Sequence, residues 1–181
     1  LSFTVLFALV TALAAWEFAT LVNAHAGAQV NRLINTVATV YLFLATAGVC
    51  SGLVTSDVFI PYLLTLIYLP VSELYLQKPD PLKNWAYAFA IQLYVGIGFS
   101  MLAVLAFRYD ALAGQVVYES AFPLSIFLFL WTSDTGAYVC GSLLHKRFPA
   151  RLFERISPKK SWVGSIGGGV LCLVMAWLLH M

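Results

Sequence analysis

Six long apolar runs constrain this 181-residue chain more than any other feature. A helix that crosses a bilayer needs about 20 consecutive, mostly apolar residues, and each run has roughly that length. Closed β-barrels are the other fold that spans a membrane, but their short strands alternate in polarity, whereas these runs are continuously apolar. We therefore predict an all-α, polytopic integral membrane bundle with about six spans, at residues 1–22, 36–53, 58–75, 85–107, 121–144 and 163–180.

The composition agrees with a membrane location. Only 10% of the residues are charged and 61% are hydrophobic, whereas a soluble domain carries about 25% charged residues. We interpret residues 1–181 as a single membrane domain, with N-terminal spans over 1–120 and substrate-site spans over 121–181. Because the chain starts with Leu1 inside an apolar run and stops directly after another, we expect both ends to be cuts in a longer protein.

The distribution of Lys and Arg predicts the orientation. Cytoplasmic loops of membrane proteins are enriched in these residues. Nine of the ten cations lie in the segments 23–35, 76–84 and 145–162, which share one side, and the opposite side has only Arg108. We therefore predict a multi-pass protein of the bacterial inner membrane with the 145–162 loop in the cytoplasm.

Asp134 is the first candidate functional residue, because it lies within a long apolar segment. A carboxylate at the centre of a span costs about 2.5–3.5 kcal/mol on insertion scales and is retained where it faces a cavity, a cation or a metal. Ser133, Ala137 and Gly141 recur every four residues, so they line one stripe of the same helix, and Ser133 is a candidate residue for substrate or phosphate binding. A structural Asp paired with a loop cation is the alternative.

Two adjacent lysines form the second candidate site. Lys159 and Lys160 follow Ser157 and Pro158, which are favoured as the N-cap and the first residue of a helix. The pattern predicts a helix that begins at Ser157 with both lysines in its first turn, where the helix dipole is already positive. An anion, typically phosphate, would relieve this repulsion. The alternative is that both lysines extend to the membrane surface.

Other residues of the segment 145–162 have weaker signals. Arg155 is a further candidate for phosphate binding. For Lys146, Arg147 and Arg151 we favour plain membrane topology and attraction to anionic lipids. Outside this segment, Glu17 and Glu73 lie near span ends, where we expect their carboxylates to reach toward the interface.

Glycines gather in the last two predicted spans. Gly164 and Gly168 have the G-x-x-x-G spacing that allows two helices to approach closely, and Gly167 lies between them. Gly136 and Gly141 lie near Asp134 in the preceding span. We predict that all five serve helix packing. They do not form a P-loop, since no Gly-Lys-Ser/Thr follows them.

These features together favour phosphoryl or nucleotidyl transfer at a membrane surface. Mg²⁺ is usually held by one or two carboxylates together with substrate phosphates, so Asp134 is the candidate metal ligand. Lysines can neutralise charge that develops on a transferring phosphoryl group. The residues alone name no acceptor.

Two sequence blocks resemble the phosphatidate cytidylyltransferase (CDP-diacylglycerol synthase) family: W-T-S-D-T-G-A-Y-V-C-G at 131–141 and I-S-P-K-K-S-W-V-G-S-I-G-G at 156–168. The resemblance implies an all-helical homodimer in which the phosphate of phosphatidic acid attacks the α-phosphorus of CTP with Mg²⁺. It implies that Asp134 serves the metal–nucleotide site. It also implies that Ser157, Lys159 and Lys160 hold phosphates of CTP or phosphatidate, and no nucleic acid is expected as a partner.

Two departures from the family pattern matter. The family usually has Glu where this chain has Val163. A later family motif with further metal-binding acids does not occur before Met181, so we expect residues 1–181 alone to be inactive. Three alternatives stay open: a CTP-dependent lipid kinase of the dolichol or phytol type, a polytopic transporter, and a non-catalytic scaffold.

Overall fold

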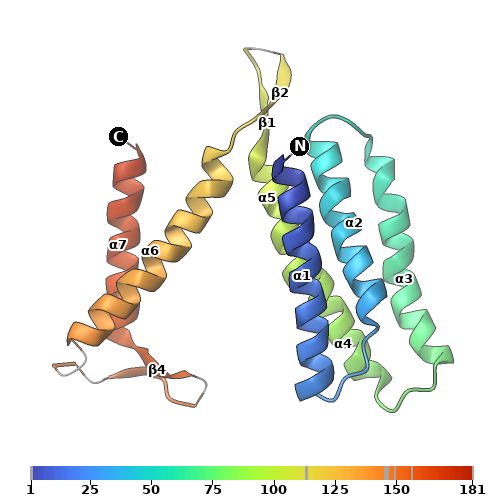
Figure 1. Ribbon diagram of the computed structural model, residues 1–181, viewed down its shortest axis with the longest axis horizontal. Helices are drawn as coiled ribbons and strands as arrows, with labels where there is room; N and C mark the ends of the chain where they lie inside the picture. The colour runs from blue at the N-terminus through green and yellow to red at the C-terminus, as the bar shows by residue number, and fades with distance from the viewer. Residues whose placement is uncertain (1, 113, 145–146, 149, 156, 181) are drawn as a thin grey trace. The chain divides into compact units, whose positions relative to one another are not determined.

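The computed structural model describes the chain except residues 1, 113, 145, 146, 149, 156 and 181, and except the side chain of Lys159. It divides into two compact units, Leu1–Ser120 and Ala121–Met181, which are described separately below and drawn together in Figure 1.

The first unit is a helical bundle that ends in a β-hairpin (Figure 1). Asn31 begins α2 as an N-cap, its side-chain oxygen accepting a hydrogen bond from the Ile34 amide at 3.1 Å. Pro81 occupies the first turn of α4, where its missing N–H costs nothing. A π-helical segment, η2, joins α4 to α5 without a break. The elements are α1 (Ser2–His25), α2 (Arg32–Cys50), the 3₁₀ turn η1 (Ser56–Phe59), α3 (Ile60–Tyr75), α4 (Pro81–Ile91), η2 (Gln92–Ile97), α5 (Gly98–Ala106), β1 (Phe107–Asp110) and β2 (Gln115–Tyr118).

The predicted all-α, polytopic class is confirmed. Within the described residues, five helical segments are long and apolar enough to cross a membrane. The fifth predicted span, 121–144, is a single helix but is not among these five, and the polar run 132–135 lies in its middle. The described residues also form two β-hairpins, β1–β2 and β3–β4, which the sequence does not predict. The five segments are Ser2–His25, Arg32–Cys50, Ser56–Tyr75, Pro81–Ala106 and Trp162–His180.

Small residues on α1 set the packing of the first unit. Thr11, Ala15 and Ala19 recur every four residues and are fully buried, so they form one stripe of the helix. Ala15 and Ala19 belong to a core cluster with Ile91 and Val95. Small side chains let helix backbones approach closely, and this is how membrane helices gain packing energy.

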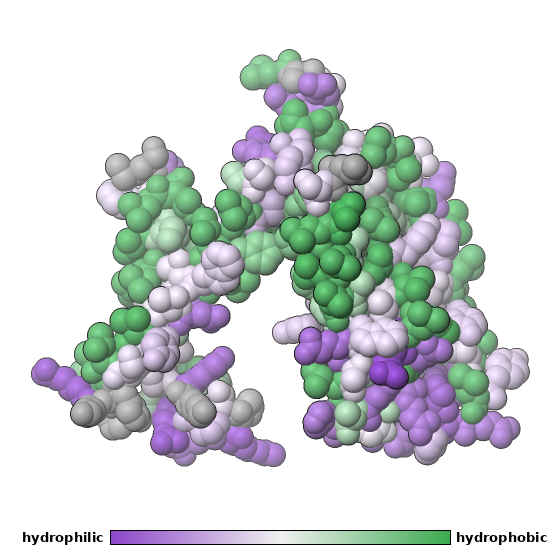
Figure 2. All heavy atoms as spheres, viewed as in Figure 1, coloured by the Kyte–Doolittle hydropathy of each residue, from purple (hydrophilic) through white to green (hydrophobic). Residues whose placement is uncertain are grey.

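Hydrophilic residues gather at one end of the first unit. In the view of Figure 2, hydrophobic side chains cover much of the bundle's flank, and hydrophilic ones lie toward the end where α1 connects to α2 and α3 connects to α4. Arg32, Lys78 and Lys83 belong to this end, and Arg108 belongs to the hairpin at the other. Three of the four cations of this unit therefore lie at one end, as the predicted orientation requires. The side of the membrane that this end faces stays a prediction.

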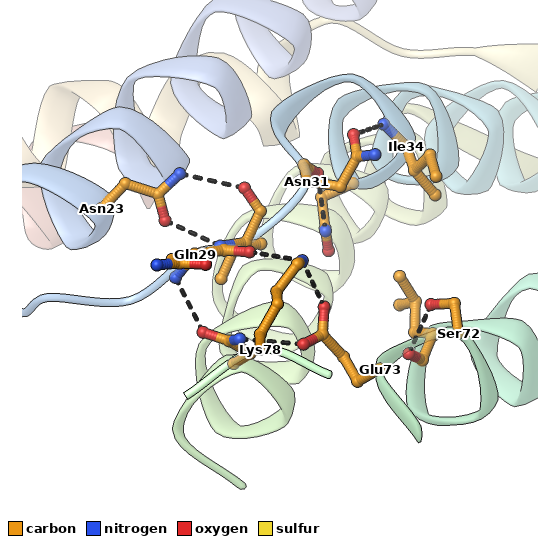
Figure 3. A network of polar contacts seen from close by, with 11 residues as sticks. Asn23, Gln29, Asn31, Ile34, Ser72, Glu73 and Lys78 are labelled. Atoms are coloured by element: carbon orange, nitrogen blue, oxygen red, sulfur yellow. Dashed lines mark hydrogen bonds and ion pairs between the residues drawn. The ribbon is translucent and has the colours of Figure 1, made fainter. Parts of the chain in front are cut away.

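Glu73 joins three segments at the hydrophilic end (Figure 3). Its carboxylate forms an ion pair with Lys78 at 2.6 Å and accepts a hydrogen bond from the Asn84 side chain at 2.8 Å. Lys78 also donates to the carbonyl of Gln29 at 2.8 Å, and Asn84 accepts from the Gln29 amide at 2.7 Å. Glu73 is buried, with 8% of its surface exposed. The carboxylate therefore lies in a buried polar network, whereas Glu17 is exposed. The expectation that both carboxylates reach toward the membrane interface stays a prediction.

Substituting Glu73→Gln is expected to destabilise the bundle by about 1.5 kcal/mol, because the charged hydrogen bond to Lys78 is lost while a polar group remains for Asn84. We would measure apparent melting temperatures of the full-length protein in detergent. Glu17→Gln removes the same charge at an exposed position of α1 and is the matched control. Equal melting temperatures for the two variants would contradict a stabilising role of the network.

The second unit consists of two helices joined by a short hairpin. Its elements are α6 (Ala121–Leu144), β3 (Arg151–Phe153), β4 (Ser157–Ser161) and α7 (Trp162–His180). The predicted helix start at Ser157 is wrong, since residues 157–161 form β4, paired antiparallel with β3. The cap is Ser161, whose hydroxyl accepts a hydrogen bond from the Gly164 amide at 3.2 Å. Strand pairing with residues 151–153 therefore overrides the local Ser-Pro signal.

Candidate active site

The packing of α6 against α7 forms the base of the candidate site. A Cβ atom added at Gly168 would lie 2.7 Å from the Ser133 carbonyl oxygen, and one added at Gly164 would lie 2.8 Å from the Ala137 carbonyl oxygen. The two helices thus touch backbone to backbone, which only glycine permits. The other predicted packing glycines lie at the same contact: Gly136 faces Gly168 and Leu171, Gly141 faces Ser161 and Gly164, and Gly167 faces Cys140.

A wide groove of about 1060 Å³ opens beside this contact, within the second unit. Ligand pockets typically have volumes of about 300–1,000 Å³, so the groove has room for a nucleotide or a lipid head group. Three elements line it. They contribute Ser133, Asp134, Ala137, Tyr138, Gly141 and Ser142 from α6; Arg151, Pro158, Lys160 and Ser161 from the β3–β4 hairpin; and Gly164 and Ser165 from α7.

Asp134 supplies the carboxylate of the groove and is exposed to it. In the described part of the chain, no ion pair includes Asp134. The side chains of the loop cations Lys146 and Lys159 lie outside the described residues, so the alternative of a structural Asp that pairs with a loop cation stays open. The Asp134 side chain is exposed where it lines the groove.

The β3–β4 hairpin supplies the positive charge. Lys160 lies in β4, directly before the Ser161 cap of α7, and its exposed side chain lines the groove. Arg151 lies in β3 opposite Ser161, and it also lines the groove. The positive end of the α7 dipole is at the same place. Although the helix starts later than predicted, Lys160 still lies beside a helix N-terminus.

Other residues predicted for the site lie elsewhere or outside the described part. Ser157 pairs with Phe153 at the far end of the hairpin, Arg155 is exposed in the turn between the strands, and neither lines the groove. The backbone of Lys159 belongs to β4, but its side chain lies outside the described residues. Val163 is half-buried in the first turn of α7 and does not line the groove.

Sequence reasoning missed several lining residues. Tyr138 and Ser142 follow Asp134 at four-residue intervals, so a second helical stripe beside the predicted one could have revealed them. Ser165 follows Ser161 at the same spacing. Arg151 had no local signal, because only the strand pairing brings it to the groove.

The oxygen-bearing side chains that line the groove with Asp134 can be compared with the needs of a metal ion. No three His, Cys, Asp or Glu side chains gather into a metal-binding cluster among the described residues, which disfavours a closed site of the zinc type. The groove offers one carboxylate and the hydroxyls of Ser133, Ser142 and Ser165. Such a set suits Mg²⁺, which takes few protein ligands and completes its shell with water and substrate phosphates.

Comparison with known proteins identifies the relatives of this chain. The model of the "Cytidylyltransferase family" matches residues 1–181. The chain belongs to the cytidylyltransferase family. Phosphatidate cytidylyltransferase of Haemophilus influenzae is 32% identical over 116 residues, which cover 64% of this chain and 37% of that protein. The protein of the same name from Staphylococcus haemolyticus is 39% identical over 82 residues, covering 45% of this chain and 26% of the relative.

The matched segments are short relative to these relatives and cover only 37% and 26% of their lengths. No solved structure matches the chain. The family membership agrees with the resemblance read from the two sequence blocks.

Proposed function

We propose that the full-length protein transfers the cytidylyl group of CTP to phosphatidic acid, giving CDP-diacylglycerol and pyrophosphate. One observation carries this proposal: an exposed carboxylate, Asp134, and two cations, Arg151 and Lys160, line one groove in a membrane protein of the cytidylyltransferase family. A carboxylate suits a metal–nucleotide complex, and the cations suit phosphate groups. The choice of reaction follows the relatives, which are named phosphatidate cytidylyltransferase.

In the proposed reaction, a phosphate oxygen of phosphatidic acid forms a bond to the α-phosphorus of CTP. The bond between the α-phosphorus and the bridging oxygen breaks, and pyrophosphate leaves with that electron pair. Asp134 would hold Mg²⁺, which when bound neutralises phosphate charge and polarises the phosphorus centre. Lys160 would stabilise negative charge that develops on the phosphoryl oxygens. Lys159 and Ser157 are proposed to assist phosphate binding on the strength of the resemblance alone.

We further propose that the protein works as a homodimer in the bacterial inner membrane, with residues 145–162 in the cytoplasm. Nine of the ten Lys and Arg residues fall on the side that this orientation makes cytoplasmic.

The test uses the full-length protein in mixed micelles with phosphatidic acid, Mg²⁺ and CTP labelled at either the α- or the γ-phosphate. We expect the α-label to enter the lipid phase and the γ-label to appear in released pyrophosphate. A γ-label in the lipid phase would indicate a lipid kinase instead. A folded protein that transfers neither label would contradict the proposed function.

A further inference from the structure

Arg151 is a groove cation whose role neither the sequence blocks nor the family membership assigns. It lies outside both blocks, and its charge alone is compatible with plain membrane topology. The structure brings it to the candidate site through strand pairing, opposite Ser161 and on the same groove as Asp134 and Lys160.

The hairpin holds the Arg151 side chain in place. Its Nη1 atom donates a hydrogen bond to the Pro158 carbonyl at 3.1 Å, which ties the end of β3 to β4. A backbone hydrogen bond extends the hairpin beyond this pair: the Trp162 amide donates to the Ala150 carbonyl at 3.2 Å. Arg151 is therefore attached to the strand that leads directly into the α7 cap, and not to a free loop.

This attachment leaves much of the guanidinium for a ligand. A guanidinium has five N–H donors in a planar fork, and the bond to Pro158 uses one of them. Arg151 is exposed where it lines the groove. Arginine binds phosphate in a bidentate manner more readily than lysine does, and the N-terminus of α7 adds to the attraction for an anion.

We propose that Arg151 is a phosphate-binding residue that positions a substrate phosphate in the groove. The proposal deepens the proposed function and rests on it for the identity of the substrates. The phosphate belongs either to the nucleotide or to the lipid head group, and both present the same chemistry to the guanidinium. Arg151 acts by positioning, while Asp134 and Lys160 serve the reacting atoms.

The experiment measures binding to the full-length protein in detergent micelles by titration calorimetry, with inorganic pyrophosphate and a short-chain phosphatidic acid as separate probes. Three substitutions are compared. Arg151→Ala removes the side chain, Arg151→Gln keeps a shorter polar side chain but removes the charge, and Arg151→Lys keeps the charge without the fork. Arg147→Ala is the matched control, because Arg147 is an exposed cation of the same segment that does not line the groove.

We expect Arg151→Ala and Arg151→Gln to weaken the binding of one probe about tenfold, as the loss of a hydrogen bond to a charged group does. The probe that is affected identifies the source of the phosphate. Arg151→Lys should restore part of the affinity, and Arg147→Ala should bind both probes as the wild type does. If Arg151→Gln binds both probes like the wild type, or if the wild type binds neither, the proposal is wrong.

Label transfer separates this outcome from the proposed function. If the wild-type protein binds pyrophosphate through Arg151 but does not transfer the α-label, the proposed reaction is wrong. The proposed phosphate-binding role of Arg151 is then still supported. If the α-label is transferred equally well with and without Arg151, at substrate concentrations near KM, the proposed reaction is supported. The proposed role of Arg151 is then wrong.

Discussion

Asp134→Asn in the full-length protein is expected to lower the transfer of α-label from CTP to lipid by about a thousandfold. The amide has the size of the carboxylate but lacks its negative charge, so it binds Mg²⁺ poorly. Metal ions supply several kcal/mol of transition-state stabilisation in phosphoryl chemistry, and about 4 kcal/mol corresponds to this factor. Raising the Mg²⁺ concentration should restore part of the activity, and the measurement is the rate as a function of Mg²⁺.

A second readout separates function from folding. Asp134 lies in an apolar helix and makes no ion pair among the described residues, so a neutral residue there removes the cost of a charge in a span. The melting temperature of Asp134→Asn should therefore equal or exceed that of the wild type. Glu154→Gln, in the exposed turn of the hairpin and outside the groove, should leave the rate unchanged. An Asn variant that keeps more than about a tenth of the wild-type rate would contradict the metal role of Asp134.

The helices of this chain could be predicted from sequence because their signal is local. Uninterrupted apolar runs predict spans, and the predicted range 121–144 has the same bounds as α6. Asp134 could also be identified from the sequence, because a charged residue inside an apolar run is energetically costly and therefore indicates a functional site.

The hairpins and the groove depend on pairing between distant residues, which local patterns do not contain. Ser157 and Pro158 form a good helix start in isolation, yet pairing with β3 makes this segment a strand and moves the cap to Ser161. The same pairing brings Arg151 to the groove. The burial of Glu73 could not be predicted for a related reason, since its partner Asn84 lies on another helix.

Gly168→Ala is expected to destabilise the packing of α6 against α7 by about 3 kcal/mol, the upper part of the range for overpacked cores. The new methyl group would lie 2.7 Å from the carbonyl oxygen of Ser133, which is backbone and cannot rotate away. The two helices must therefore move apart. Because Ser133 lines the groove beside Asp134, we expect the transfer rate to fall together with the melting temperature.

Gly169→Ala provides the matched control on the next residue of α7. A Cβ atom there has no neighbour within 4 Å, so this variant receives the gain in helix propensity, about 1 kcal/mol, without the clash. The difference between the two variants therefore isolates the helix contact. Gly141→Ala should also avoid a clash, because its Cβ would lie 3.5 Å from the Ser161 hydroxyl, an ordinary contact distance. If Gly168→Ala and Gly169→Ala have the same melting temperature and rate in micelles, α6 and α7 do not meet at Gly168, and the groove beside them is not built as described.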